Sequence, residues 1–128
     1  MKIGIIDADL IGRKKHRFPN LACEKISGYW KDNGADVSLL MSFSEVSAII
    51  EHRENIDETF DLIYISKVFT DTYVPDFIYD IANNDYSHER IYVGGTGFYF
   101  DKAPNLPEEI EHHMPDYDLR NRSFLYVL

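Results

Sequence analysis

The sequence predicts one α/β domain in which helices cover both faces of a mainly parallel sheet of four to five strands. Two observations support this fold class. Short apolar runs alternate along the chain with stretches in which apolar residues recur at helical spacing. Strands that alternate with helices are joined by right-handed crossovers, so the neighbouring strands are parallel. The second observation is the length of 128 residues, which suits one domain with a core of its own.

The first half of the chain is expected to supply two strands and two helices. Residues 2–7, KIGIID, are an apolar run typical of a buried strand, and residues 36–41 alternate as a second strand. Between them, Pro19 can occupy the first turn of a helix that ends at Asn33-Gly34. A serine then caps a short helix that extends to about residue 53.

The second half is expected to add two further strands and a helix. Residues 60–69, FDLIYISKVF, predict the third strand, and Pro75 opens a helix that fades at Asn83-Asn84. Residues 90–93 predict a fourth strand, which Gly94-Gly95 ends.

The last part of the chain contains less regular signals. Residues 106–114 can hold a short helix, and residues 124–128, FLYVL, can add an edge strand. We therefore expect a three-layer flavodoxin-like or Rossmann-like domain with strand order 2-1-3-4 over residues 1–117. Residues 118–128 are then a tail or an edge strand.

Charge and cysteine content exclude several classes of function. The net charge of −9 argues against general binding to nucleic acid or anionic lipid, although residues 13–17, RKKHR, form a basic run. A single cysteine, Cys23, excludes an internal disulfide and any metal cluster held by several thiolates. Cys23 lies within an amphipathic helix, which predicts a packing role. The chain shows no signal peptide and no apolar run of membrane-spanning length, so we expect a cytoplasmic protein.

Polar residues follow three of the predicted strands at the end where parallel sheets bind ligands. The stretch after the first strand runs about ten residues, longer than the usual two to six, which favours a binding role. The candidate ligand-binding residues at this edge are Asp7, Asp9, Gly12, Arg13, Lys14, His16, Arg17, Ser66, Lys67, Thr70, Gly94, Gly95 and Thr96.

Each of these signals also has a purely structural interpretation. The basic run can be a solvated surface, and Gly94-Gly95 can simply permit a tight turn. His112 and His113 are adjacent and point in different directions on a helix, so we expect a polar face and no metal site. Dinucleotide-binding, P-loop and nucleophile-elbow motifs are absent from the sequence, which removes the usual support for those enzyme classes.

The ordered motifs resemble those of cobalamin-binding domains, whose pattern is DxHxxG after the first strand, SxL with a nearby threonine after the third, and GG after the fourth. The corresponding stretches are DADLIG at residues 7–12, SKVFT at residues 66–70 and GG at residues 94–95. Longer phrases, such as YVGGTGF and DKAPNLPEEIEHHMPDY, are similar to the cobalamin-binding-like domain at the amino end of uncharacterised radical S-adenosylmethionine proteins from bacteria and phages. The resemblance covers about residues 1–117.

The resemblance implies a ligand-binding or accessory domain without catalysis of its own. Asp9 stands where that family has its cobalt-ligating histidine, so cobalamin could bind only without that ligand. The radical enzymes hold an iron–sulfur cluster with three cysteines, and one cysteine cannot do so.

Other functions are left open by the residues themselves. One is a stand-alone binder, or sponge, of a small phosphorylated metabolite or nucleotide, because the basic run can grip phosphate. Another is a protein-interaction module that forms a homo-oligomer or docks on a catalytic partner protein. An enzyme in which Asp7 and Asp9 act as an acid–base pair is the least favoured reading.

Overall fold

Four parallel strands form the sheet at the centre of the computed structural model, which describes residues 1–12, 20–52, 59–69, 71–83, 89–95, 97 and 106–119. The strands are β1 (Lys2–Asp7), β2 (Asp36–Leu39), β3 (Leu62–Ser66) and β4 (Ile91–Gly94). Their order is β2-β1-β3-β4, and every pairing is parallel. This confirms the predicted fold class and strand order.

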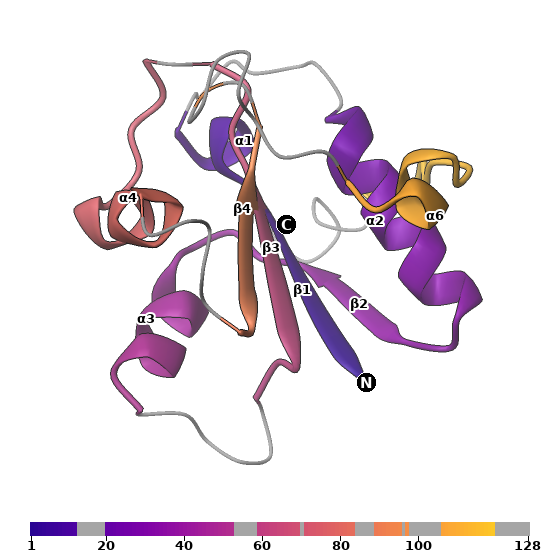
Figure 1. Ribbon diagram of the computed structural model, residues 1–128, viewed down its shortest axis with the longest axis horizontal. Helices are drawn as coiled ribbons and strands as arrows, with labels where there is room; N and C mark the ends of the chain where they lie inside the picture. The colour runs from indigo at the N-terminus through magenta and orange to yellow at the C-terminus, as the bar shows by residue number, and fades with distance from the viewer. Residues whose placement is uncertain are drawn as a thin grey trace.

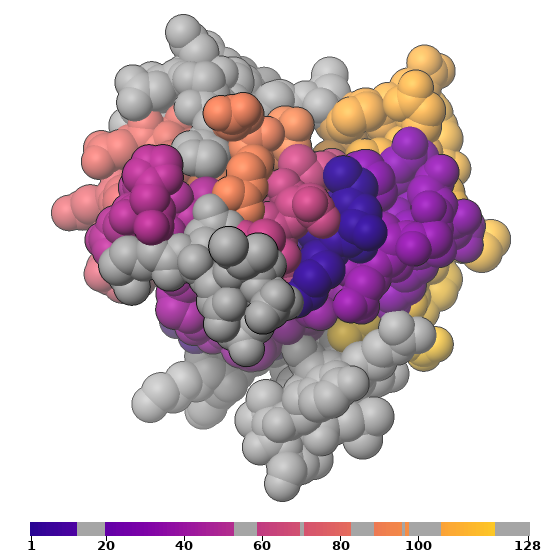
Figure 2. Space-filling model, turned by 90° about the horizontal axis from the view of Figure 1, so that it is seen from below, coloured from indigo at the N-terminus to yellow at the C-terminus, as the bar shows by residue number. Residues whose placement is uncertain are grey.

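Helices cover both faces of this sheet (Figure 1). Helices α3 (Ser44–Ile50) and α4 (Asp76–Asn83) lie on one face. On the other face lie α2 (Leu21–Asp32) and the short α6 (Glu108–Glu111). Seen from below, toward the amino ends of the strands, the segments around β4, β3 and β1 reach the surface side by side (Figure 2).

The apolar residues of the strands divide between the two faces because successive side chains of a strand point in opposite directions. Ile63 and Ile65 pack in a cluster with α3 and α4, whereas Tyr64 packs on the α2 side. The buried members of the α2 cluster are Ile3, Ile5, Cys23, Ile26, Ile110 and Leu119. Both faces of the sheet are therefore packed, as a parallel sheet requires.

The stretch after β1 differs from the expected ten-residue loop. Residues 8–12 form a short helix, α1 (Ala8–Gly12), and the Asp7 carboxylate accepts a hydrogen bond from the backbone N–H of Leu10 at 3.2 Å. Asp7 thus acts as an N-cap, a role for which aspartate is well suited. The prediction of one long loop is wrong for these five residues.

Two further differences concern the carboxyl end of the chain. The helix expected over residues 106–114 is confined to the four residues of α6. Leu119 falls within the predicted tail, yet its side chain is buried in the α2 cluster. The predicted edge strand at residues 124–128 lies outside the described residues.

Candidate ligand-binding site

Three of the predicted site residues share one row at the carboxyl edge of the sheet. Asp7 pairs with Ser66, and Ser66 pairs with Gly94, in the register of β1, β3 and β4. The structure therefore brings together the ends of three strands whose residues lie far apart in the sequence. The side chains of Asp7 and Ser66 face α2, since Ile5 and Tyr64, two residues earlier on β1 and β3, belong to the α2 cluster.

Asp9 lies at the same edge, but its side chain is turned into the protein. One carboxylate oxygen accepts from the hydroxyl of Thr72 at 2.7 Å, and the other accepts from the backbone N–H of Val68 at 2.7 Å. The N–H of Phe69 adds a longer bond at 3.3 Å. The side chain is 1% exposed. Asp9 therefore fastens the loop after β3 to α1, and both of its oxygens are engaged in that task.

Lys67 is likewise an interior residue, although lysine usually lies at the surface. It is fully buried, its ammonium contacts the Tyr79 hydroxyl at 2.5 Å, and the ammonium lies 5.0 Å from the centre of the same ring. Because Lys67 follows Ser66 directly, the two side chains leave the chain on opposite faces. Lys67 consequently points toward α4, away from the row that Ser66 belongs to.

The paired glycines after β4 have different surroundings. Gly95 has a φ of +104°, and a Cβ there would collide with the backbone of Lys67. At Gly94, by contrast, a Cβ would meet no atom of the described residues within 4 Å. Gly95 thus permits close packing between two loops, whereas none of the described residues fills the space above Gly94. Gly12 resembles Gly95, because its Cβ would lie 2.8 Å from a methyl carbon of Thr72.

Asn20 links the beginning of α2 to the end of β3. Its side-chain oxygen accepts from the N–H of Cys23 at 3.1 Å, and its amide donates to the Ser66 hydroxyl at 3.0 Å. The sequence prediction missed Asn20, although an asparagine directly before a helical run is a recognised N-cap signal. By capping α2 and binding Ser66 together, Asn20 fixes where that hydroxyl lies.

A small pocket opens beside this contact, between β1, β2 and α2. Its volume is about 10 Å³, room for about one water molecule, which is far below the usual range of about 300–1,000 Å³ for ligand pockets. The lining residues are Asp7, Leu10, Asn20, Cys23, Glu24, Leu39 and Leu119. The pocket is therefore too small for the ring of a nucleotide or of a corrinoid.

Cys23 lies at the inner wall of this pocket as a packing residue. Burial raises the pKa of its thiol well above the ordinary value, and the charges of nearby carboxylates, that of Asp7 foremost, add to the rise. A hydrogen bond with Ser66 only partly offsets them. The thiol therefore stays protonated and unreactive near neutral pH.

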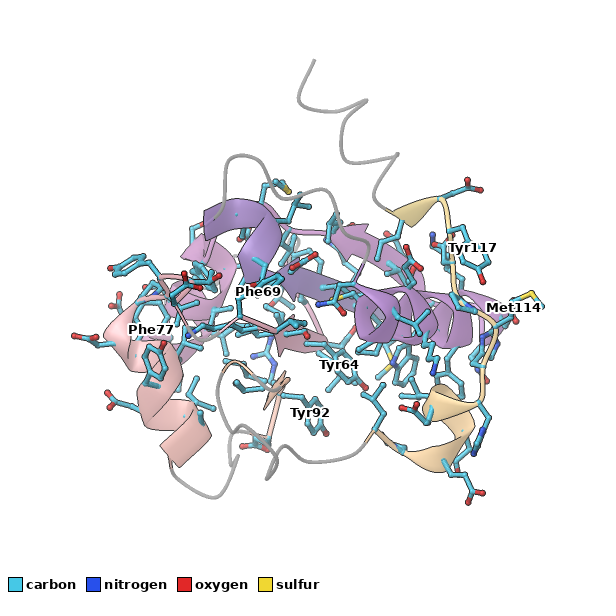
Figure 3. All side chains as sticks on the ribbon, turned by 90° about the horizontal axis from the view of Figure 1, so that it is seen from above. Tyr64, Phe69, Phe77, Tyr92, Met114 and Tyr117 are labelled. Carbon is cyan, nitrogen blue, oxygen red and sulfur yellow. The ribbon has the colours of Figure 1, made fainter. Side chains whose placement is uncertain are left out.

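Two stacked tyrosines lie one step below Ser66 and Gly94 on the same face. Tyr64 pairs with Tyr92 in the β3–β4 register, and their ring centres are 5.1 Å apart with planes 24° from parallel. Both rings lie on the side of the sheet that faces α2 (Figure 3). Trp30 donates its indole N–H to the Tyr64 hydroxyl at 3.1 Å, which fixes the inner ring. Tyr92 is 45% exposed, so its ring is accessible from solvent.

Ser66, Gly94, Tyr64 and Tyr92 thus form a grid of two rows on two neighbouring strands. Gly94 is the corner of that grid that carries no side chain, with Ser66 beside it on β3 and the Cα atom of Tyr92 about 7 Å away along the strand. The exposed Tyr92 ring, the Gly94 backbone and the Ser66 hydroxyl together suit a ligand with a flat ring that carries a polar group.

The remaining predicted site residues lie outside the described residues. They are Arg13, Lys14, His16, Arg17, Thr70 and Thr96. Within the part of the chain that the structure describes, no group of three or more His, Cys, Asp or Glu side chains could hold a metal ion. That part also contains no helix with the length and apolar character needed to span a membrane.

Comparison of the chain with protein-family models, curated proteins and solved structures finds no match in any of the three. The likeness to cobalamin-binding-like domains therefore stays a prediction that rests on the quoted motifs.

Proposed function

We propose that this chain is a non-catalytic ligand-binding domain whose ligand lies over Gly94, with a flat ring against Tyr92 and a polar group at the Ser66 hydroxyl. The observation that carries the proposal is the space above Gly94 that none of the described residues fills, bordered by an exposed aromatic ring and a positioned hydroxyl. Parallel sheets bind ligands at this edge, which supports the choice of site.

A nucleotide offers the chemistry that this arrangement favours. Its base provides the flat ring, its ribose provides hydroxyls, and its phosphate can meet the basic residues 13–17, which join Gly12 to Asn20 along the chain. The phosphate has no evident place at the beginning of α2, because Asn20 caps that helix and the Glu24 carboxylate lies in its first turn. The anion is therefore assigned to the basic residues.

A corrinoid is the second ligand to be tested, because its tail also carries a nucleotide. The Asp9 carboxylate is bound to Val68, Phe69 and Thr72, so a corrinoid would bind without a protein ligand to cobalt from this position. Binding of this second ligand would support the role proposed from the resemblance, that of an accessory domain to a radical enzyme.

Thermal-shift titrations and native mass spectrometry of the purified chain separate these ligands. We expect AMP to raise the melting temperature and ribose 5-phosphate to do so much less, because the latter lacks the ring. A shift with hydroxocobalamin and none with AMP would identify a corrinoid binder. No shift with any of the three, together with a stable oligomer in the mass spectrum, would favour a protein-interaction module and contradict the proposal.

A pair of tyrosine variants tests the place of the ring. Tyr92→Ala should weaken AMP binding about tenfold, since stacking of a base on an aromatic ring is worth about 1–3 kcal/mol. Tyr73→Ala is the matched control, because Tyr73 is an exposed tyrosine in the loop after β3 and lies outside the grid. Equal affinities of the two variants would overturn the proposed position.

A further inference from the structure

The segment that contains α6 wraps around the outer side of α2. Residues 106–119 begin beside one flank of the helix, where Ile110 joins the α2 cluster, and end on its other flank, where Leu119 joins the same cluster. Figure 3 shows α6 on one side of α2, Tyr117 on the opposite side, and Met114 between them at the outer surface. We call residues 106–119 the clasp.

Three ion pairs fasten the clasp to α2. The Lys25 ammonium lies 3.0 Å from the Glu111 carboxylate, and the His113 ring lies 2.7 Å from the Asp32 carboxylate. The third pair joins Lys31 and Asp116. Three residues of the helix thus meet three residues of the clasp along its length.

Asp116 makes the most contacts of these clasp residues. Its carboxylate also accepts from the Ser27 hydroxyl at 2.8 Å, and its backbone N–H donates to the Glu24 carbonyl at 2.8 Å. Loss of the Asp116 charge is therefore the single change that should loosen the clasp most.

Gly28 shows that α2 is shaped to receive the clasp. A Cβ at this position would collide with the Met114 carbonyl oxygen and would lie 3.0 Å from a ring nitrogen of His113. A glycine in the middle of a helix costs about 1 kcal/mol relative to alanine. The close approach of the clasp accounts for its presence here.

The clasp also forms one wall of the pocket at the end of β1. Leu119 lines that pocket together with Asp7 and Cys23. The clasp has three apolar anchors in the α2 cluster, Leu106, Ile110 and Leu119. Its other contacts with α2 include the three ion pairs, and ion pairs near a protein surface are weak and are screened by salt. Elements held in this way open at a lower free energy than the whole domain.

We propose that residues 106–119 are a releasable clasp, and that opening of its ion pairs to α2 controls access to the pocket beside Cys23. This inference goes beyond the proposed ligand site, because it concerns the covering of the neighbouring pocket and holds whether or not a nucleotide binds over Gly94.

Labelling of Cys23 with N-ethylmaleimide, followed by mass spectrometry, measures clasp opening in the intact chain. Cys23 is the sole cysteine in the sequence, so the label reports one site. We expect labelling of the native protein to accelerate when NaCl is raised from about 50 mM to about 1 M, because the ion pairs are screened. Asp116→Asn should label about tenfold faster than the wild type, the effect of losing one hydrogen-bonded charge.

The matched control is Glu109→Gln on α6. It makes the same change in net charge at an exposed residue outside the three ion pairs, and its labelling rate should equal that of the wild type. Equal acceleration in both variants would mean that overall charge, and not the clasp, governs access, and would overturn the proposal.

Gly28→Ala tests the clasp without any change of charge. Alanine favours the helix, so the variant should be more stable if the clasp does not press on α2. We expect instead faster labelling of Cys23, because the added methyl displaces the clasp at Met114.

The dependence on urea separates local opening from unfolding of the whole domain. A local opening exposes little surface, so the labelling rate should rise with urea far less steeply than global unfolding does. The labelling rate could instead depend on urea as steeply as global unfolding does, in the wild type and in both variants. That result would show that Cys23 is reached only through complete unfolding and would refute the clasp.

Discussion

The Asp9 carboxylate and the Thr72 hydroxyl form a buried hydrogen bond of 2.7 Å that joins α1 to the loop after β3. The same carboxylate binds the backbone of that loop at Val68 and Phe69. Asp9 thus holds together two segments of the candidate site, α1 and the loop after β3.

Asp9→Asn should lower the free energy of unfolding by about 2 kcal/mol, because an amide offers one acceptor oxygen where the carboxylate offers two, and hydrogen bonds to a charge are the stronger kind. Asp9→His should cost more, since a bulkier ring cannot fit the buried position without displacing the loop. Urea unfolding measures both, with Asp80→Asn at an exposed position of α4 as the control. If Asp9→Asn proves no more destabilising than that control, the structural role of Asp9 is wrong.

The two glycines after β4 should respond differently to alanine. Gly95→Ala should cost about 3 kcal/mol or more, because it adds strain at a positive φ to a collision with the Lys67 backbone. Gly94→Ala should change stability by less than about 1 kcal/mol, since its Cβ enters open space. Chemical denaturation of the two variants is the measurement, and similar losses in both would contradict the separate roles assigned to the pair.

The raised pKa of Cys23 gives stability a defined dependence on alkaline pH. The unfolded thiol loses its proton around its ordinary pKa of 9.0, whereas the folded thiol keeps it, so stability falls as pH rises above 9. Burial is the main reason that the pKa of Tyr64 is raised above 10.0, so the loss of folding stability continues to higher pH. The urea concentration at the midpoint of unfolding should fall between about pH 8 and about pH 10, and this fall should be smaller in Cys23→Ala than in the wild type. An identical difference in both proteins would exclude the thiol as a cause.

Asp116 should give the opposite dependence in acid. Burial tends to raise the pKa of its carboxyl, but hydrogen bonds from Lys31 and Ser27 and the Lys31 charge outweigh burial and hold the pKa below its ordinary value of 3.8. The stabilisation is therefore complete above pH 3.8 and is lost as pH falls through the folded pKa. The stability difference between wild type and Asp116→Asn should shrink between about pH 5 and about pH 2. A difference that stays constant over this range would show that the Asp116 charge contributes nothing.

The strands themselves could be predicted from the sequence because apolar runs, such as those around Ile5 and Ile63, are local patterns. The strand order followed from the flavodoxin-like fold class, and the general rule for parallel sheets then placed Asp7, Ser66 and Gly94 at one edge. The role of Asp7 as the N-cap of α1 could also have been predicted, since aspartate is a strong N-cap residue.

The orientation of the site residues depended on contacts that no local pattern reveals. The partners of Asp9 lie about 60 residues further along the chain, so its inward orientation follows only from the folded loops. For Lys67 a signal did exist, because adjacent strand residues face opposite sides and Ser66 and Lys67 cannot both line one face. The stacking of Tyr64 on Tyr92 required the register of β3 and β4, which the sequence does not supply.

Calorimetric titration of AMP into the wild type and into Gly94→Val tests the proposed site most directly. The valine side chain enters the space above Gly94, where a Cβ meets no atom of the described residues, and the melting temperature of the variant checks that it folds. The account predicts that the wild type binds AMP and that Gly94→Val, equally well folded, binds it at least about tenfold more weakly. Equal affinities in the two proteins, or no binding by the wild type, would contradict a nucleotide site over Gly94.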